Sequence, residues 1–221
     1  MLDSNKIKEI IAKNIALELK PNSYINLGVG VPTLVANYIT PEQNIILHAE
    51  NGLVGTGRDL TVEEAEDLDV ISSSGFPATY MKGAAFMDSS LSFGIIRGKH
   101  LDATVLGTME VDQEGNIANY IIPNKLVSGM GGTMDLCVGA RNVIVATTHT
   151  NKGKAKILKK CTIPLTAQKV VTKIVTEKAI FDVKDNHLEL VGYNPLFTVE
   201  DILKEVEADV IVSENLREMS I

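Results

Sequence analysis

A carboxylate stands where an apolar run meets a glycine turn in residues 47–55, which read LHAENGLVG. The run at 44–49 has the length and composition of a buried strand, so we expect Glu50 at the end of a strand. In open parallel sheets ligands bind at the carboxyl ends of strands, and Gly52 lets a backbone or a ligand approach closely. The residues allow either a carboxylate that faces a ligand or a solvated turn with an Asn51-Gly52 corner.

Three glycines in four positions form a second feature, within residues 128–136, which read SGMGGTMDL. Such a segment leaves backbone N–H groups uncovered, and the residues after it could start a helix, so the glycines could bind an anion or an oxyanion. A flexible turn or tight packing explains them equally well. The Gly28-Val29-Gly30 segment does not fit G-x-G-x-x-G, and a tight turn between a strand and a helix accounts for it.

The other ionisable clusters favour structural roles. Five lysines within 152–160 form a basic cluster of the kind that usually covers a solvated face. His48 and His149 end apolar runs without a carboxylate or cysteine at a useful spacing, so we expect them to be packed or hydrogen-bonded. The acidic run at 63–69 lacks a metal-ligand pattern, and we expect a surface segment there and no metal site.

Composition narrows the class of protein. The chain has 221 residues, enough for one α/β domain spanning 1–221, with 45% hydrophobic and 22% charged residues. A net charge of −7 argues against a nucleic-acid partner, because phosphate binding requires a basic surface. Cys137 and Cys161 have neither metal nor disulfide spacing and are expected to be small buried residues. Without an apolar leader or a run of 18 apolar residues, we expect a cytoplasmic protein with no membrane partner.

The apolar pattern predicts strands that alternate with helices. A helix with Asp3 or Ser4 as N-cap is expected from the spacing of the isoleucines at 7–15, and a short helix at 33–39. Buried strands are expected at 24–27, 44–49, 68–72, 103–106 and 142–147. This order predicts an α/β fold with a mainly parallel sheet flanked by helices.

Antiparallel hairpins are expected in the second half of the chain. The polar residues 111–116 separate two apolar arms, and 184–186 separate 179–183 from 187–191. Thr198 and Asp201 resemble a capping box that opens a helix extending through Glu207, and a strand at 209–213 completes the pattern.

Taken together, these segments resemble family I coenzyme A transferases, specifically the beta subunit of the acetoacetate/butyrate/acetate type. The shared segments occur in family order and at close to family spacing, and they lie at 27–32, 48–52, 96–100, 104–107, 115–119, 129–132, 134–136 and 160–165. They cover 24–166 densely and the rest loosely. The chain departs from the family where Ala49 replaces a serine, which leaves the carboxylate of Glu50 in place and bears on its hydrogen bonding.

The resemblance implies that Glu50 attacks an acyl-CoA thioester and carries CoA as a covalent glutamyl thioester. It assigns the backbone at Gly131 and Gly132 to the oxyanion and makes Asn51 a neighbour that orients Glu50. We also expect the glycines at 28, 30 and 52 to border bound CoA.

The resemblance also implies a partner. An alpha subunit of similar size should complete the active site in a hetero-oligomer, α2β2 or larger, with CoA as a substrate and no permanently bound cofactor. Two alternatives are a non-catalytic ligand sensor on a related scaffold and a nucleotide-dependent oxidoreductase, which would need the G-x-G-x-x-G turn that this chain lacks.

Overall fold

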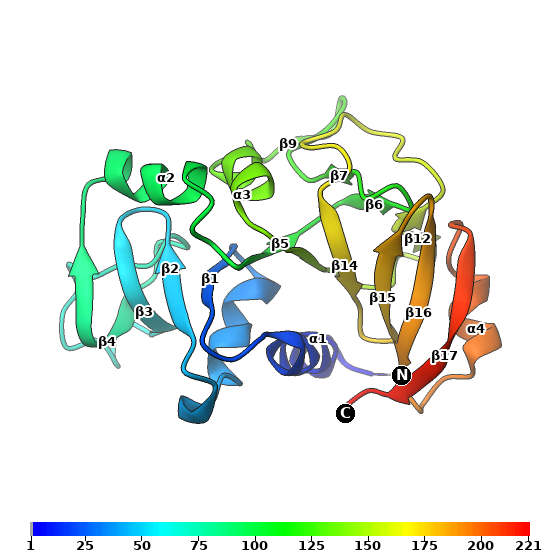
Figure 1. The fold of residues 1–221 in the computed structure, drawn as a ribbon, viewed down its shortest axis with the longest axis horizontal. Helices are drawn as coiled ribbons and strands as arrows, with labels where there is room; N and C mark the ends of the chain where they lie inside the picture. The colour runs from blue at the N-terminus through cyan, green and yellow to red at the C-terminus, as the bar shows by residue number, and fades with distance from the viewer. Residues whose placement is uncertain (1) are drawn as a thin grey trace.

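The computed structural model describes residues 2–221, and one ten-stranded mixed sheet dominates it (Figure 1). The strand order is β17-β16-β15-β14-β10-β5-β1-β2-β3-β4. Its parallel centre consists of β14 (Val171–Val175), β10 (Val143–Ala146), β5 (Ala103–Gly107), β1 (Tyr24–Leu27) and β2 (Ile46–Ala49). These strands are short and apolar because both of their faces are covered, as is usual for parallel sheets. The predicted fold class, a mainly parallel sheet flanked by helices, is confirmed.

Antiparallel strands extend the sheet on both sides. One side carries β3 (Leu53–Asp59) and β4 (Ala78–Phe86), which the sequence pattern did not predict. The other carries the predicted hairpin of β15 (Ala179–Lys184) and β16 (His187–Tyr193), followed by β17 (Val210–Glu218), which pairs parallel to β16.

Short strands form three small sheets outside the main one. The predicted hairpin at 111–116 is present as β6 (Glu110–Asp112) and β7 (Ile117–Ala118), and β13 (Ile157–Leu158) joins it. The other two sheets pair β8 (Ile121–Ile122) with β9 (Leu126–Val127) and β11 (Thr150–Asn151) with β12 (Lys154–Ala155).

Helices cover both faces of the sheet. Helix α1 (Ser4–Glu18) begins at the predicted N-cap Asp3, whose carboxylate accepts from two backbone N–H groups. It buries its isoleucines on one face together with the 3-10 helix η1 (Val31–Asn37), which stands where a short helix was predicted. Helices α2 (Ser89–Arg97) and α3 (Thr133–Gly139) lie over the opposite face (Figure 1). The remaining helices are η2 (Pro41–Gln43) and α4 (Val199–Lys204).

Two sequence-based expectations need correction. The segment 68–72 is not a strand: a single bridge joins Ile71 to Pro77, and Leu68 and Ile71 are exposed, so no apolar face is buried there. Helix α4 ends at Lys204, before the predicted Glu207, although Thr198 caps it as expected by accepting from the N–H of Asp201. Within residues 2–221 no helix is long and apolar enough to cross a membrane.

Candidate active site

Glu50 directly follows β2, at the carboxyl end of the strand, and is half-buried. The chain then turns through Gly52 into β3. Gly52 has a φ of 128°, and a Cβ added there would lie 2.1 Å from the carbonyl oxygen of Met87, the residue that leads into α2. Gly52 is therefore required for packing of the turn against that backbone, and it does not line the cavity described below. Its expected place beside CoA stays a prediction.

A row of polar side chains fixes the position of Glu50. Asn26 on β1 lies in register with His48 on β2 and with Thr104 on β5. The Nδ2 of Asn26 donates to a carboxylate oxygen of Glu50 (Oε2, 2.9 Å) and to the carbonyl of His48 (3.1 Å). Its Oδ1 accepts from the hydroxyl of Thr104 at 3.1 Å. Because both ends of the Asn26 amide are occupied, this fully buried side chain holds the carboxylate of Glu50 in one orientation.

Sequence reasoning assigned this orienting role to Asn51, and the structure gives it to Asn26. The amide of Asn51 is exposed and donates to the carbonyl of Ile71 at 2.9 Å. Within residues 2–221, no hydrogen bond joins Asn51 to Glu50. The sequence does contain a signal for Asn26. It is the one amide residue inside the apolar strand Tyr24–Leu27, and a buried polar side chain in such a strand needs a hydrogen-bond partner.

Glu50 lines a cavity of about 480 Å³. The residues that line it come from the ends of β1, β2, β5 and β7, from the glycine-rich segment before α3, and from α3 itself: Gly28, Val29, Glu50, Leu106, Gly107, Thr108, Asn119, Ser128, Gly129, Met130, Gly131, Gly132, Thr133 and Leu136. The structure thus brings together Gly28, Gly131 and Gly132 with Glu50. Gly30, with a φ of 94°, caps η1 instead and does not line the cavity.

The glycine-rich segment faces the carboxylate. A Cβ added to Gly132 would lie 3.5 Å from Cγ of Glu50 and 3.2 Å from the ring of Phe93. In the part of the chain that the structure describes, neither Gly131 nor Gly132 donates a backbone hydrogen bond. Two uncommitted N–H groups in a segment that lines the cavity beside a carboxylate are suited to bind an oxyanion.

His48 lies in the strand just before Glu50 and is buried, with 1% of its surface exposed. Its Nε2 is 2.8 Å from the hydroxyl of Ser92 on α2, and its ring meets the ring of Tyr24 edge-on at 5.5 Å. Burial lowers the pKa of His48 to about 4, and the charge of Glu50 opposes this shift only in part. His48 is therefore neutral at pH 7, and the predicted packed or hydrogen-bonded role is confirmed.

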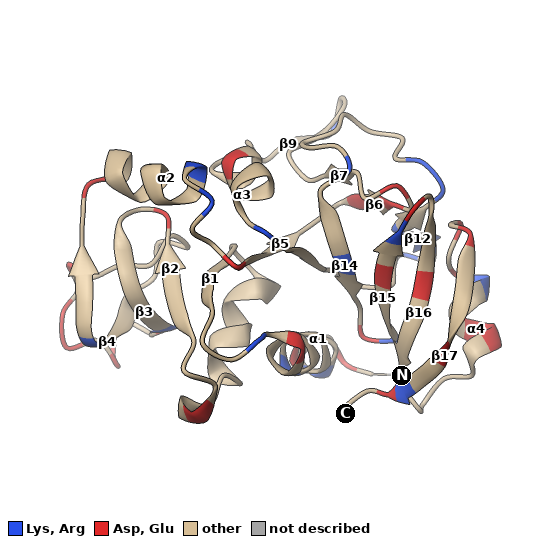
Figure 2. Ribbon diagram, in the orientation of Figure 1, with Lys and Arg blue, Asp and Glu red and all other residues tan. Residues whose placement is uncertain are grey.

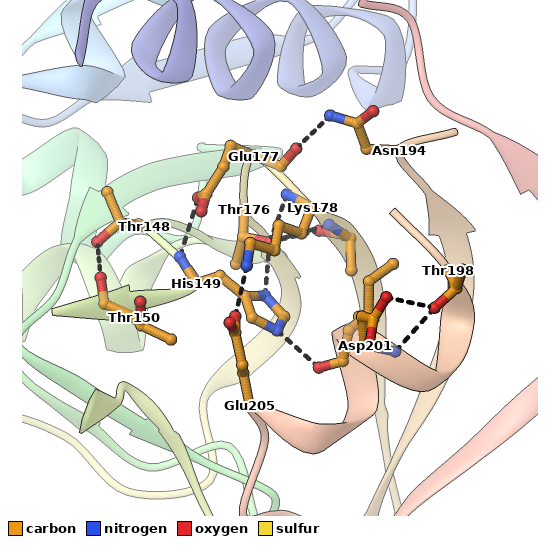
Figure 3. A network of polar contacts seen from close by, with 12 residues as sticks. Thr148, His149, Thr150, Thr176, Glu177, Lys178, Asn194, Thr198, Asp201 and Glu205 are labelled. Carbon is orange, nitrogen blue, oxygen red and sulfur yellow. Dashed lines mark hydrogen bonds and ion pairs between the residues drawn. The ribbon is translucent and has the colours of Figure 1, made fainter. Parts of the chain in front are cut away.

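His149 belongs to a separate network that ties the end of β10 to α4 (Figure 3). Its Nε2 lies 3.0 Å from the carbonyl oxygen of Ile202, so this nitrogen carries the proton, and Nδ1 faces the hydroxyl of Thr176 at 3.0 Å. Its backbone N–H donates to the buried carboxylate of Glu177 at 2.9 Å. This histidine has the hydrogen-bonded role that was predicted and does not line the cavity around Glu50.

The lysines of 152–160 do not form one solvated face. Four of them are exposed, as predicted, and Lys159 pairs with Asp209 at 2.8 Å. Lys156 is the exception: it is half-buried, and desolvation lowers its pKa to about 8 against the opposing charge of Glu177. Figure 2 shows acidic and basic residues interspersed over the neighbouring strands β14, β15 and β16 and helix α4.

The cysteines fit the structural reading. Cys137 is buried in α3 and Cys161 is half-buried, and both are free thiols. Burial raises the pKa of both thiols, and for Cys161 the nearby carboxylate of Asp112 adds to the effect. Raised thiol pKa values argue against a reactive role for either residue.

The chain belongs to the coenzyme A transferase family, whose model matches residues 8–205, and it is therefore an enzyme of the transferase class. It is 46% identical to the beta subunit of the acetate CoA-transferase of Haemophilus influenzae, over 97% of this chain and 96% of the relative. It is 43% identical to the corresponding subunit of the succinyl-CoA:3-ketoacid coenzyme A transferase of Helicobacter pylori, over 92% and 98% of the two chains. The predicted family is confirmed, and the alternative of a non-catalytic sensor is not favoured.

The fold is also that of solved structures. An acyl-CoA transferase from Escherichia coli O157:H7 superposes with a TM-score of 0.77 at 23% identity. The match covers 100% of this chain and 44% of that chain, so this chain corresponds to less than half of the other polypeptide.

Proposed function

We propose that this chain transfers coenzyme A between short-chain acyl-CoA and a short-chain carboxylic or 3-oxo acid, through a glutamyl-CoA thioester on Glu50. The observation that carries the proposal is the half-buried carboxylate of Glu50, which Asn26 holds and which lines one cavity with Gly131 and Gly132, whose N–H groups donate no backbone hydrogen bond among the described residues. The relatives are named as subunits, which supports a second, alpha subunit that completes the site in a hetero-oligomer.

The transfer needs four steps. They convert one thioester into another without hydrolysis, so the free energy of the thioester bond is conserved. The free oxygen of Glu50, Oε1, attacks the acyl-CoA carbonyl and expels the CoA thiolate, which leaves a mixed anhydride. The thiolate attacks the glutamyl carbonyl and releases the first acid as a carboxylate. An incoming carboxylate then attacks the glutamyl-CoA carbonyl and expels the CoA thiolate, which leaves a second mixed anhydride. The thiolate attacks the acyl carbonyl of this anhydride, which gives the second acyl-CoA and releases Glu50 as a carboxylate. The proposed chemistry uses CoA as a substrate and needs no resident cofactor.

Oxyanions form at two positions in this sequence, and the site offers donors for both. The first develops on the acyl carbonyl, within reach of the backbone N–H groups at Gly131 and Gly132. The second develops on Oε2 of Glu50 when the thiolate attacks the glutamyl carbonyl, and the amide of Asn26 already donates to that oxygen at 2.9 Å. A donor aimed at the atom where charge develops requires no rearrangement at the moment of reaction.

Magnitudes show why several groups must act together. A thiolate is about four pKa units more basic than a glutamate carboxylate, so the first displacement is uphill by roughly 5 to 6 kcal/mol. One oxyanion donor supplies about 3 to 4 kcal/mol. Binding of the remote nucleotide part of CoA can offset much of the remainder.

The test is to trap the covalent intermediate. With the alpha subunit and acetoacetyl-CoA present but no acceptor acid, Glu50 should accumulate as the CoA thioester, and borohydride should reduce it to an alcohol that peptide mass analysis places at Glu50. Glu50→Gln should form no adduct and lose transfer, whereas the matched surface control Glu200→Gln should retain both. Label at another residue, or CoA exchange by Glu50→Gln, would refute the proposal.

A further inference from the structure

Helix α2 contacts the segment that carries Glu50 on both sides of this residue. Before it, Nε2 of His48 lies 2.8 Å from the hydroxyl of Ser92, and both side chains are buried. After it, the carbonyl of Gly52 accepts at 2.9 Å from the N–H of Met87, the residue that leads into α2. Glu50 therefore lies between two residues that contact α2 or the residue leading into it.

The same helix contacts the glycine-rich segment. The ring of Phe93 lies 3.2 Å from the position of a Cβ added to Gly132, and that position is 3.5 Å from Cγ of Glu50. The guanidinium of Arg97 lies over this ring, 5.6 Å from its centroid, and donates at 2.7 Å to Asp135 in the first turn of α3. Arg97 thus contacts both the ring that faces the glycines and the helix that follows them.

Helices α2 and α3 pack closely near their C-terminal ends (Figure 1). A Cβ added to Gly139 would lie 2.2 Å from the carbonyl oxygen of Ile96, so the backbones can approach this closely only with glycine at that position. Ile96 and Leu136 are buried in one hydrophobic cluster, against which Phe93 also packs. Because close-packed interiors transmit displacements, a shift of α2 would also shift α3 and the glycines before it.

We propose, resting on the transferase function above, that Ser92 and Phe93 are positioning residues. Through them, α2 sets the spacing between the carboxylate of Glu50 and the oxyanion donors of the glycine-rich segment. The Cα atoms of these two neighbours are about 3.8 Å apart, and successive residues of a helix point about 100° apart, so one faces β2 and the other faces the glycines. A misplacement of about 1 Å in a reacting site can cost about a hundredfold in rate.

The proposal predicts that two reactions at Glu50 respond differently. Formation of the glutamyl-CoA thioester begins at the acyl carbonyl, whose oxyanion needs the donors of the glycine-rich segment at the right distance. Hydroxylamine cleaves the finished thioester differently: the amine attacks the glutamyl carbonyl, the CoA thiolate leaves and takes up the proton that the nitrogen loses, and a glutamyl hydroxamate remains. That oxyanion lies on Oε2, to which Asn26 donates. A change in the spacing should therefore slow formation and spare cleavage.

The experiment measures both rates with the reconstituted two-subunit enzyme and acetoacetyl-CoA. Formation is followed by single-turnover quenched flow, and cleavage by release of CoA from the accumulated thioester with hydroxylamine. Phe93→Leu removes the ring atoms nearest Gly132 and should slow formation about tenfold or more, while the cleavage rate stays within about twofold. Ser92→Ala removes the contact with His48 and should give the same pattern with a smaller loss, about threefold or more.

Two further variants serve as controls. Leu91→Ala, at an exposed position of the same helix, should leave both rates within about twofold of normal, whereas Asn26→Ala should slow both reactions.

A folded Phe93→Leu enzyme that forms the thioester at the normal rate would overturn the proposal. An equal loss in both rates would also overturn it, because a general loosening of the fold would then explain the effect. If Phe93→Leu does not fold, the same two rates in Ser92→Ala decide. Failure of the unmodified enzyme to form any glutamyl-CoA would reject the transferase function itself, and the positioning role with it.

Discussion

Replacing Asn26 tests whether its amide, on β1, holds the carboxylate of Glu50 in the orientation needed for attack. Asn26→Ala removes the 2.9 Å bond to Oε2 of Glu50. A hydrogen bond to a charged group contributes about 1.5 to 3 kcal/mol, which is a factor of about 10 to 150 in rate. Since the same oxygen becomes an oxyanion in the second step, we expect the upper part of this range, about a hundredfold slower formation of the glutamyl-CoA thioester.

The assay is a single-turnover measurement of thioester formation by quenched flow, with the unfolding free energy measured in parallel because Asn26→Ala also leaves the buried carbonyl of His48 without its partner. Thr104→Val is the matched variant: it removes only the 3.1 Å bond that fixes the other end of the amide, a neutral bond worth about 0.5 to 1.5 kcal/mol, so a loss of about two- to twelvefold is expected. A folded Asn26→Ala enzyme within about threefold of the normal rate would refute the reasoning.

Three further predictions concern the rest of the site and its surroundings. Gly132→Val should lower turnover by about two orders of magnitude in a folded protein, the loss typical of one oxyanion donor, because the β-branched side chain would block the approach of the reacting carbonyl to the backbone N–H. Gly94→Ala, at a helical glycine with open space around its Cβ position, should not lower it, and normal turnover in Gly132→Val would remove this glycine from the site. Because the pKa of His48 falls from 6.5 in the unfolded chain to about 4 in the native state, its contribution to stability is fully present above pH 6.5 and is lost as the pH falls towards 4, by about 3 kcal/mol in all. Urea unfolding at pH 7 and 4.5 should show a smaller loss for His48→Gln than for the unmodified protein, and an equal loss would contradict the assignment. Lys154→Glu should change the KM for acyl-CoA less than about fivefold at moderate salt, because the lysine is exposed and such charges contribute little; a large, salt-sensitive rise would show that it contacts a CoA phosphate.

The parallel centre of the sheet was predictable, and its edge was not. The strands β1, β2, β5 and β10 are apolar runs that must be buried on both faces, so composition alone indicates them. The strand β4 is exposed along most of its length and β3 contains two glycines, so neither shows the alternation of a half-buried strand. The prediction of a strand at 68–72 is wrong for the opposite reason: the apolar residues of this segment suggest a strand, but nothing in the described fold covers them.

The location of the candidate site was predictable from the sequence, but the side chain that contacts Glu50 was not. The position of Glu50 after an apolar run indicated a strand end, and the glycines before α3 indicated an anion site, and the structure brings the two into one cavity. The partner of Glu50 could not be read from its neighbours in the chain. Asn26 is 24 residues away, and the hydrogen bond follows from the register of β1 with β2, which a local pattern does not contain.

The chain of hydrogen bonds from Thr104 through Asn26 to Glu50 has a consequence for folding. Thr104 and Asn26 are 78 residues apart, and they meet only when β5 has paired with β1. Parallel pairing between distant segments forms slowly, because the chain must lose loop entropy before any contact rewards it. A chain that has paired only β1 with β2 holds its glutamate beside an amide that is still free to rotate. For the proposed reaction on Glu50, competence is thus acquired when β5 pairs with β1, so we expect recovery of activity to mark native topology more strictly than does burial of the apolar core.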